Sequence, residues 1–481
     1  MIAVLKENLA PLMFGGLVLF LLIGYPAAFS LAAVGMFFGL IAVELGVFDA
    51  NFLGAVPVQL YGIISNDLLL AIPFFTFMGA ILERCGLAED LLDSIGQLFG
   101  PVRGGLSYAV IFVGAILGAI TGTVAASVIA MGVISLPVMM RYNYNMQHAT
   151  GVIAASGTIT QLIPPSLVLV VLADVMGKSV GDMYAGAIGP SILQVALFCA
   201  WVAILSVIRP QDVPALPPEA RTLRGWALIW KCMRGIVPSA VLIFLVLGTI
   251  FLGLATPTEA GAMGAVGAIA LAAMYRTLTW KLTYQAMAST MRITAMVTFI
   301  LIGSRVFSIT FQGVGGSIWI EHLLTQLPGG QVGFLAFAMV FIFFIAFFLD
   351  FFEIAFIIVP MLTPAADKLG IDLIWFGLLI CANIQTSFMH PPFGFALFYL
   401  RGIAPPEVKS RDIYIGSIPW IGTQIILVAI MIIWPGLVTY WIEKPVVSDP
   451  AAIERQLQNL TPRDDSPGIP QIDVTQPPKI Q

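Results

Sequence analysis

Long uncharged runs of apolar residues alternate with short polar segments along most of this chain. The longest uncharged runs are residues 8–43, 104–140, 142–173, 183–208, 235–258, 323–349, 373–400 and 413–442. A transmembrane helix needs about 20 mostly apolar residues to cross about 30 Å of hydrocarbon, so the longest runs each hold two passes, or a pass and a hairpin. The pattern therefore predicts an all-α membrane protein with about ten to twelve transmembrane helices and two re-entrant hairpins.

Two polar segments divide this pattern. Residues 209–234 hold five basic residues against two acidic ones and are rich in proline. Basic loops stay on the cytoplasmic side, so this segment is predicted to be a cytoplasmic linker. It separates two hydrophobic halves, residues 1–208 and 235–443. A polar tail follows at residues 444–481; it lacks a periodic apolar pattern and is predicted to be disordered or to lie on the surface.

The N-terminal region is predicted to be a membrane segment and not a cleaved signal peptide. Its apolar stretch starts near Leu9 and continues to Val43, well beyond the 7–15 residues of a signal-peptide core. Gly24-Tyr25-Pro26 is the predicted break between the first two passes.

The two halves share a local sequence pattern. Residues 155–165 and 382–392 each begin with alanine and end in a proline pair. Counting back from the prolines, Ser156 matches Asn383 and Thr160 matches Ser387. The chain is therefore predicted to contain an internal repeat.

A proline pair cannot continue a helix, because it removes two N–H donors and disfavours the α conformation before it. A helix broken within lipid leaves backbone groups unpaired unless the break is buried in protein or lines a cavity. Broken helices at matching places in two halves are typical of a transporter binding site, where free carbonyls and nearby hydroxyls can hold a cation. The alternative is that each pair ends a span at the membrane interface.

Other polar residues in apolar runs allow two interpretations each. Gly114, Gly118 and Gly122 recur every four residues and lead into Thr121 and Thr123, as expected of close helix packing or of a hairpin tip that binds an ion. Asp350 and Glu353 lie in a run that is otherwise apolar; they either mark the membrane interface or belong to a site at the second hairpin.

Composition excludes several classes of protein. Of the 481 residues 59% are hydrophobic and only 10% are charged, which is too little charge for a soluble protein of this size. The net charge of −4 offers no basic excess for nucleic acid. The four cysteines and three histidines are dispersed, which argues against a disulfide framework, a zinc site or an intramembrane catalytic centre. No G-x-x-x-x-G-K-[ST] loop for ATP is found.

Five short motifs together resemble one known family. They are Ala71-Ile72-Pro73-Phe74-Phe75, Arg103-Gly104-Gly105-Leu106, the segment from Gly118 to Thr123, Ile163-Pro164-Pro165-Ser166 and Pro391-Pro392-Phe393-Gly394. Residues 1–443 resemble the large, DctM-like membrane subunit of tripartite ATP-independent periplasmic (TRAP) transporters. The resemblance implies two inverted repeats in which a fixed scaffold (about residues 1–60 in the first half) carries a moving transport domain (about 68–180 and 323–400).

The resemblance also implies a mechanism and partners. The expected protein is a multi-pass protein of the bacterial inner membrane and not an enzyme. It would import a carboxylate-type organic acid by a sodium-coupled elevator movement, with Na⁺ as coupling ion and no nucleotide. A small four-helix membrane subunit and a periplasmic substrate-binding protein are the expected partners, and no nucleic acid is expected.

Site residues follow from the resemblance by position. The first sodium site would use Thr121, Thr123, Thr160, Ile163 and Pro165. The second would use Asp350, Ser387, His390 and Phe393. Imidazole is a poor sodium ligand, and the family often has threonine or glycine where this chain has Ser387 and His390, so the second site is expected to be reshaped or to use only the His390 backbone. The substrate would lie near the residues Ser156, Asn383 and Gln385.

Three alternatives stay open at this point. A self-sufficient sodium/anion symporter of similar fold would work without a binding protein. A channel would need a repeated selectivity filter, and an intramembrane enzyme would need a catalytic constellation; neither is found in the sequence. If the halves are inverted repeats, Pro164-Pro165 and Pro391-Pro392 should meet near the bilayer midplane from opposite sides.

Overall fold

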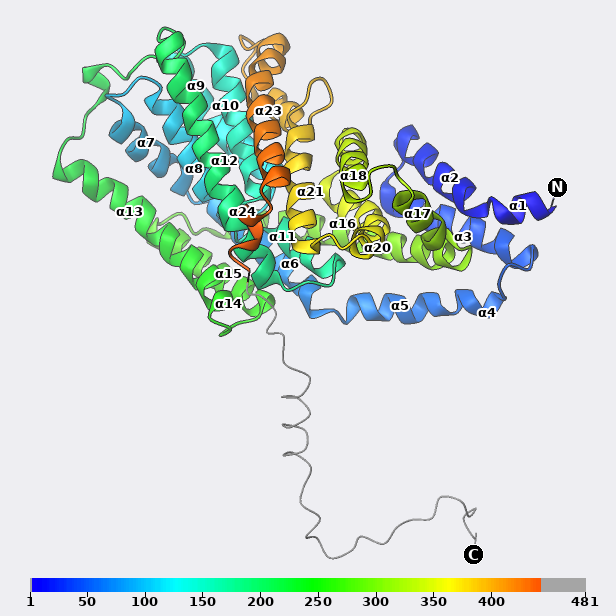
Figure 1. The fold of residues 1–481 in the computed structure, drawn as a ribbon. Coiled ribbons are helices and arrows are strands. Elements are labelled where there is room, and N and C mark those ends of the chain that lie inside the picture. Colours follow the sequence, from blue (N-terminus) through cyan, green and yellow to red (C-terminus); the bar gives the residue numbers. More distant parts are fainter. Residues whose placement is uncertain (1, 443–481) are drawn as a thin grey trace, which may run out of the picture. The chain divides into compact units, whose positions relative to one another are not determined.

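The computed structural model describes residues 2–442. The predicted tail at residues 444–481 therefore lies outside the described residues. Within residues 2–442 every regular element is helical and no strand occurs (Figure 1). The prediction of an all-α fold is thus confirmed.

The first half of the chain forms twelve α-helices and one short 3₁₀ helix. They are α1 (Ile2–Glu7), α2 (Leu9–Ile23), α3 (Ala27–Glu44), α4 (Ala50–Leu53), α5 (Ala55–Ile64), α6 (Asp67–Arg84), α7 (Leu87–Phe99), α8 (Gly105–Thr121), α9 (Val124–Arg141), α10 (Met146–Thr158), η1 (Ile159–Gln161), α11 (Leu167–Val175) and α12 (Val180–Ile208). The predicted break between the first two passes is confirmed, because α2 ends at Ile23 and Gly24 adopts a left-handed conformation with φ 90°.

The second half begins after a short 3₁₀ turn, η2 (Pro218–Ala220). It comprises α13 (Trp226–Ile243), η3 (Phe244–Gly248), α14 (Thr249–Phe251), α15 (Pro257–Met274), α16 (Trp280–Gly313), α17 (Gly316–Thr325), α18 (Gln331–Ile345), α19 (Phe351–Glu353), η4 (Ile354–Ile358), α20 (Val359–Lys368), α21 (Leu373–Phe388), α22 (Phe395–Ile403), α23 (Ser410–Ile433) and α24 (Gly436–Thr439). The elements η3 and η4 are single turns of π-helix.

Seven described helices are long and apolar enough to cross a membrane alone, and the bent pair formed by residues 50–64 and 69–84 would make an eighth. Four further apolar helices, α2, α8, α18 and α21, have only 10–17 residues. The estimate of ten to twelve spans assumed continuous helices of about 20 residues. The structure instead divides several of the apolar runs, at the proline pairs and at residues 346–350, into shorter helices.

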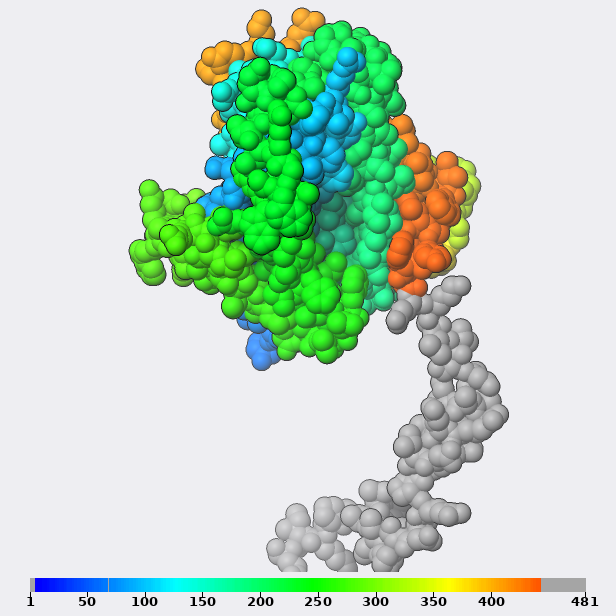
Figure 2. All heavy atoms as spheres, turned by 90° about the vertical axis from the view of Figure 1, so that its left-hand side faces the viewer, coloured from blue at the N-terminus to red at the C-terminus, as the bar shows by residue number. Residues whose placement is uncertain are grey.

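The predicted linker is shorter than residues 209–234, because α13 already begins at Trp226. Lys231, near the start of α13, forms an ion pair with Asp93 of α7. Burial of Asp93 alone would raise its pKa, but hydrogen bonds from Lys231 and Gln97 outweigh burial and hold the pKa of Asp93 below its usual value. Figure 2 shows α13 lying beside α7 on this face, so residues 226–234 belong to the helical body.

Candidate functional site

Both proline pairs interrupt helices within the fold. In the first half α10 continues as η1 to Gln161, Pro164-Pro165 follow, and α11 starts at Leu167. In the second half α21 ends at Phe388 and α22 starts at Phe395, with Pro391-Pro392 between them. Both Pro–Pro peptide bonds are cis. The sequence thus predicted correctly where both helices break.

The two broken helices contact each other crosswise. The first part of each one, α10 or α21, packs on the second part of the other, α22 or α11. The neighbouring hairpins follow the same arrangement, since α9 packs on α22 while α19 and η4 pack on α11. The two halves thus exchange equivalent contacts, while their inverted orientation in the membrane stays a prediction. The depth of the breaks in a bilayer stays a prediction.

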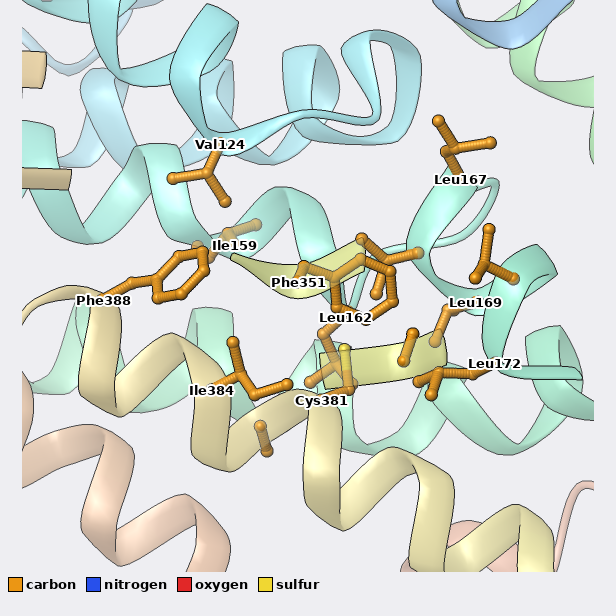
Figure 3. Close-up of a cluster of buried hydrophobic side chains, with 14 of the residues drawn as sticks. Val124, Ile159, Leu162, Leu167, Leu169, Leu172, Phe351, Cys381, Ile384 and Phe388 are labelled. Carbon is orange, nitrogen blue, oxygen red and sulfur yellow. The ribbon is translucent and has the colours of Figure 1, made fainter. Parts of the chain in front are cut away.

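Buried apolar side chains of the two broken helices and of the helices that follow the two hairpin tips pack into one cluster (Figure 3). All are buried, and they come from both hairpins and both broken helices: Val124, Ile159, Leu162, Leu167, Leu169, Leu172, Phe351, Cys381, Ile384 and Phe388. Val124 follows the tip of the first hairpin, and Phe351 follows the tip of the second. The two predicted sodium regions therefore share one apolar core and do not merge into a single polar chamber.

Side chains satisfy several carbonyls that the first break releases. Ser191 of α12 donates its hydroxyl to the carbonyl of Leu162 at 3.0 Å, and Ser166 donates to that of Gln161 at 3.1 Å. The hydroxyl of Tyr184 donates to the carbonyl of Ser166 at 3.4 Å, and this oxygen also accepts the N–H of Val170 in the first turn of α11. The predicted sodium ligands at this break are the carbonyls of Thr160, Ile163 and Pro165, and none of them accepts one of these side-chain hydrogen bonds.

Two glycines bring the first hairpin close to the first broken helix. A Cβ atom on Gly114 would lie 2.6 Å from the Cβ of Ser156, and one on Gly118 would lie 3.1 Å from the Cα of Thr160. Any larger residue would force α8 away from α10 and η1. Ser156 and Thr160 are fully buried, and the Ser156 hydroxyl has no hydrogen-bond partner within residues 2–442.

The matching contact in the second half uses hydrogen bonds. The Asn383 amide donates to the carbonyl of Met339 at 2.7 Å, and the Ser387 hydroxyl donates to that of Phe343 at 2.8 Å. Both carbonyls belong to α18 and lie four residues apart, as do Gly114 and Gly118 in α8. Residues that match in the two sequence repeats thus contact matching helices. The predicted role of Asn383 in binding substrate would require its amide to give up the carbonyl of Met339.

The tip of the first hairpin is a sharp turn around Gly122, whose φ of 67° favours glycine. Thr121 is buried, and its hydroxyl lies 2.6 Å from that of Ser127. Thr123 begins α9, but its side chain forms no capping hydrogen bond. The hydroxyl of Thr123 is therefore not engaged in holding this tip, whereas the hydroxyl of Thr121 has a structural partner.

Asp350 and Glu353 cap the second hairpin tip. The Asp350 carboxylate accepts from the backbone N–H of Glu353 at 2.8 Å, and the Glu353 carboxylate accepts from the N–H of Asp350 at 2.9 Å. This reciprocal capping box starts α19 and the π turn that follows. Thr256 and Glu259 form the same motif at the start of α15, as a first-turn acid predicts. The two acids at 350 and 353 thus have a structural function whether or not they bind an ion.

His390 lies at the second break among aromatic rings. Its ring centroid is 5.3 Å from that of Phe343 and 5.4 Å from that of Phe347. Its backbone carbonyl accepts from the N–H of Gly394 at 2.8 Å, and its buried Nδ1 has no partner within the described residues. Phe393 contacts Phe347 and is 46% exposed. The structure thus surrounds this part of the second predicted sodium site with apolar groups.

Four buried glutamines lie in or beside the broken helices, and only one of them, Gln385, was predicted from the sequence to belong to the site. The amide of Gln194 in α12 donates to the Gln385 side chain at 2.5 Å. The amide of Gln424 in α23 donates to the hydroxyl of Thr158 at 3.1 Å. The side-chain oxygen of Gln161 and the amide nitrogen of Gln385 are buried without partners in residues 2–442. Gln194 and Gln424 each lie in an uncharged, mostly apolar run. A polar amide isolated in such a run could have predicted a hydrogen bond between helices.

The sequence profile of the family described as "Tripartite ATP-independent periplasmic transporter, DctM component" matches residues 14–437. The chain belongs to this family. The permease is 30% identical to the C4-dicarboxylate TRAP transporter large permease protein DctM of Pseudomonas aeruginosa over 400 residues, covering 82% of this chain and 90% of that one. It is 26% identical to the protein of the same name from Rhodobacter capsulatus over 445 residues, covering 89% and 97%.

Other relatives of the permease carry different substrates in their names. They are described as TRAP permeases for sialic acid in Vibrio cholerae, for 2,3-diketo-L-gulonate in Escherichia coli and for isethionate in Oleidesulfovibrio alaskensis. The isethionate protein is named DctMQ, and this chain spans 61% of its length. The permease is therefore a membrane transport subunit of the bacterial inner membrane, as predicted.

The fold of the permease also matches a solved structure, the YdaH transporter of Alcanivorax borkumensis. The TM-score is 0.62 with 16% identity, and the match covers 82% of this chain and 91% of that one. At this identity the likeness concerns the fold alone.

Proposed function

We propose that the permease imports an organic acid together with sodium by an elevator movement of a transport domain against a scaffold. The observation that carries this proposal is the crosswise contact of two broken helices, each beside a hairpin. Such a pair offers one binding region that can be reached from either face in turn. The named substrates of the relatives include dicarboxylates, a diketo sugar acid and sialic acid, which favours a carboxylate-type substrate here.

Sodium would bind at the two hairpin tips. At the first tip the side chain of Thr123, together with Thr121 and the carbonyls of Thr160, Ile163 and Pro165, supplies the oxygen ligands that a hard cation prefers. At the second tip Asp350, Ser387 and the backbone of His390 and Phe393 are the candidates. The Ser387 hydroxyl and the His390 carbonyl already have protein partners, so this second site would require them to accept an ion in addition.

The substrate would bind near Ser156, Asn383 and Gln385. Two buried groups without partners support this location, the Ser156 hydroxyl and the Gln385 amide nitrogen. A buried polar group without a hydrogen bond costs free energy, and a ligand carboxylate or hydroxyl would supply the missing partner. Both atoms can donate, which suits an anionic substrate.

Two partners complete the proposed system. A small four-helix membrane subunit would pack on the scaffold, and a periplasmic binding protein would deliver the substrate. A candidate surface for this subunit is the part of an apolar groove of about 740 Å³ that α15 and α16 form; the third wall of the groove is α6, which lies in the expected transport domain. The groove is lined by side chains such as Phe74, Phe77 and Val266, which suit a helix or lipid.

Proteoliposomes would test the proposal. They would contain the permease and its small subunit, with the binding protein and a radiolabelled C4-dicarboxylate or sialic acid outside. Uptake should require an inward sodium gradient and should not respond to ATP. Uptake that persists unchanged when choline replaces sodium would contradict the coupling.

A second candidate is a self-sufficient sodium/anion symporter, in line with the fold likeness to the YdaH transporter. The same vesicles without the small subunit and binding protein distinguish the two. Full uptake by the permease alone would favour the symporter, and uptake only with all three components would favour the tripartite system.

A further inference from the structure

A groove of about 360 Å³ lies at the end of α12, between this helix, the start of α10 and the first turns of α23. One wall is apolar and includes Trp201, Ile204 and Ile208 of α12. The lining also has polar groups, which are Asn145, Gln147, His148, Arg209 and Asp212. The groove therefore combines an apolar wall with charged groups.

The apolar wall is part of a membrane-facing surface. Residues 180–208 form one of the seven candidate spans, and Ile204 and Ile208 near its end are 48% and 69% exposed. Arg209 follows directly and ends the helix. The transition from apolar wall to charged residues thus coincides with the transition from hydrocarbon to headgroup region that a span of this length requires.

The lining presents separate positive and negative groups. Arg209 is exposed and forms no ion pair within residues 2–442. Asp212 is positioned by Asn145, whose amide donates to the Asp212 carboxylate at 3.2 Å and whose backbone N–H donates to the Asp212 carbonyl at 3.0 Å. A hydrogen bond of 3.0 Å from the N–H of Asp212 to the carbonyl of Arg209 closes the turn between them. The backbone turn therefore keeps residues 209 and 212 close together, and their side chains form no ion pair within the described residues.

We propose that this groove binds one molecule of phosphatidylethanolamine. The guanidinium of Arg209 would hold the phosphate through paired hydrogen bonds, the carboxylate of Asp212 would hold the ammonium group, and an acyl chain would lie along Ile204 and Ile208. Phosphatidylglycerol lacks a cation for Asp212, and free phosphate leaves the apolar wall uncovered. Charge complementarity thus selects a zwitterionic phospholipid with an exposed ammonium group.

The bound lipid would connect the start of the first broken helix, α10, with two neighbouring helices, α12 and α23. Asn145 caps α10, Arg209 ends α12, and Ile415 of α23 lies in the same groove. We expect the lipid to stabilise this junction, and the inference does not depend on the transported substrate or on sodium.

Thermal unfolding of the delipidated, detergent-purified permease tests the proposal without any substitution. Added phosphatidylethanolamine should raise the midpoint at a concentration roughly tenfold lower than phosphatidylglycerol, because one charge-assisted contact distinguishes them. Phosphoethanolamine without acyl chains should have no effect at these concentrations. Equal responses to the two phospholipids would overturn the proposal.

Three variants sharpen the test. Arg209→Gln should abolish the response to both phospholipids, and Asp212→Asn should abolish the preference for phosphatidylethanolamine while leaving the response to phosphatidylglycerol. Arg276→Gln removes an exposed cation that follows another spanning helix, α15, and should behave like the unaltered protein. A preference that survives Asp212→Asn, or is lost equally in Arg276→Gln, would contradict the assigned contacts.

Discussion

The two broken helices hold their neighbouring hairpins by different chemistry at matching positions. In the first half, Gly114 and Gly118 let α8 approach the backbone of Ser156 and Thr160. In the second half, Asn383 and Ser387 reach across to carbonyls of α18. Close packing and cross-helix hydrogen bonds therefore serve the same contact in the two halves, and a repeat can conserve geometry while its residues diverge.

The surroundings of the breaks differ as well. Pro164 and Pro165 are buried, and hydroxyls of α11 and α12 satisfy the neighbouring carbonyls. Pro392 and Phe393 are exposed beside aromatic side chains of the second hairpin. The first break is thus a hydrogen-bonded turn buried inside the protein, while the second is more exposed.

The largest expected effect breaks the glycine contact of the first half. Gly114→Ala would place a Cβ 2.6 Å from that of Ser156 and 2.9 Å from its carbonyl oxygen. We expect a loss of about 3 kcal/mol in the free energy of unfolding, at the upper end for overpacked sites. Gly422→Ala in α23 is the matched control, since nothing lies within 4 Å of its added Cβ, and it should be stabilising by about 0.5–1 kcal/mol. Thermal unfolding in detergent measures both, and equal shifts would refute the packing explanation.

The next effect separates the two kinds of contact. The double variant Asn383→Ala/Ser387→Ala removes two cross-helix hydrogen bonds and should cost about 2 kcal/mol, at about 1 kcal/mol each. The matching change in the first half, Ser156→Ala, should change stability by less than about 0.5 kcal/mol, because the buried Ser156 hydroxyl has no hydrogen bond to lose. The same denaturation assay applies, and a loss in the first half as large as in the second would erase the distinction.

The capping box at the second tip gives a smaller effect. Asp350→Ala should destabilise by about 1 kcal/mol through loss of the cap. Asp350→Asn keeps the capping oxygen and should leave stability nearly unchanged, so any loss of sodium dependence in this variant would report on the charge alone. If Asp350→Asn destabilises as much as Asp350→Ala, capping does not explain the role of this residue.

The smallest effect on stability is expected at the first tip. Thr123→Ala removes a hydroxyl that makes no cap, so the free energy of unfolding should change by less than about 0.5 kcal/mol. If this hydroxyl binds sodium, half-maximal uptake should require severalfold more sodium. Thr121→Ala also loses the contact with Ser127 and serves as the comparison in which both stability and coupling change. A sodium titration of Thr123→Ala that overlays the unaltered protein would remove this residue from the site.

The sequence alone determined the main architecture. Uncharged runs of apolar residues predicted the all-α membrane fold, because lipid tolerates few charges and requires paired backbone groups. The proline pairs fixed where the two helices break, since proline supplies no N–H at those points. Motif resemblance then identified the family that the profile match shows.

Only the tertiary structure decided what the polar residues near the breaks contact. In the sequence Asp350 and Glu353 are recognisable only as two acids in an apolar run. Their pairing as a capping box depends on where α19 begins. The partners of Gln385 and Asn383 lie 191 and 44 residues away in the chain. Local sequence specifies helices and their ends because those follow from neighbouring residues, whereas hydrogen bonds between helices depend on how distant segments pack.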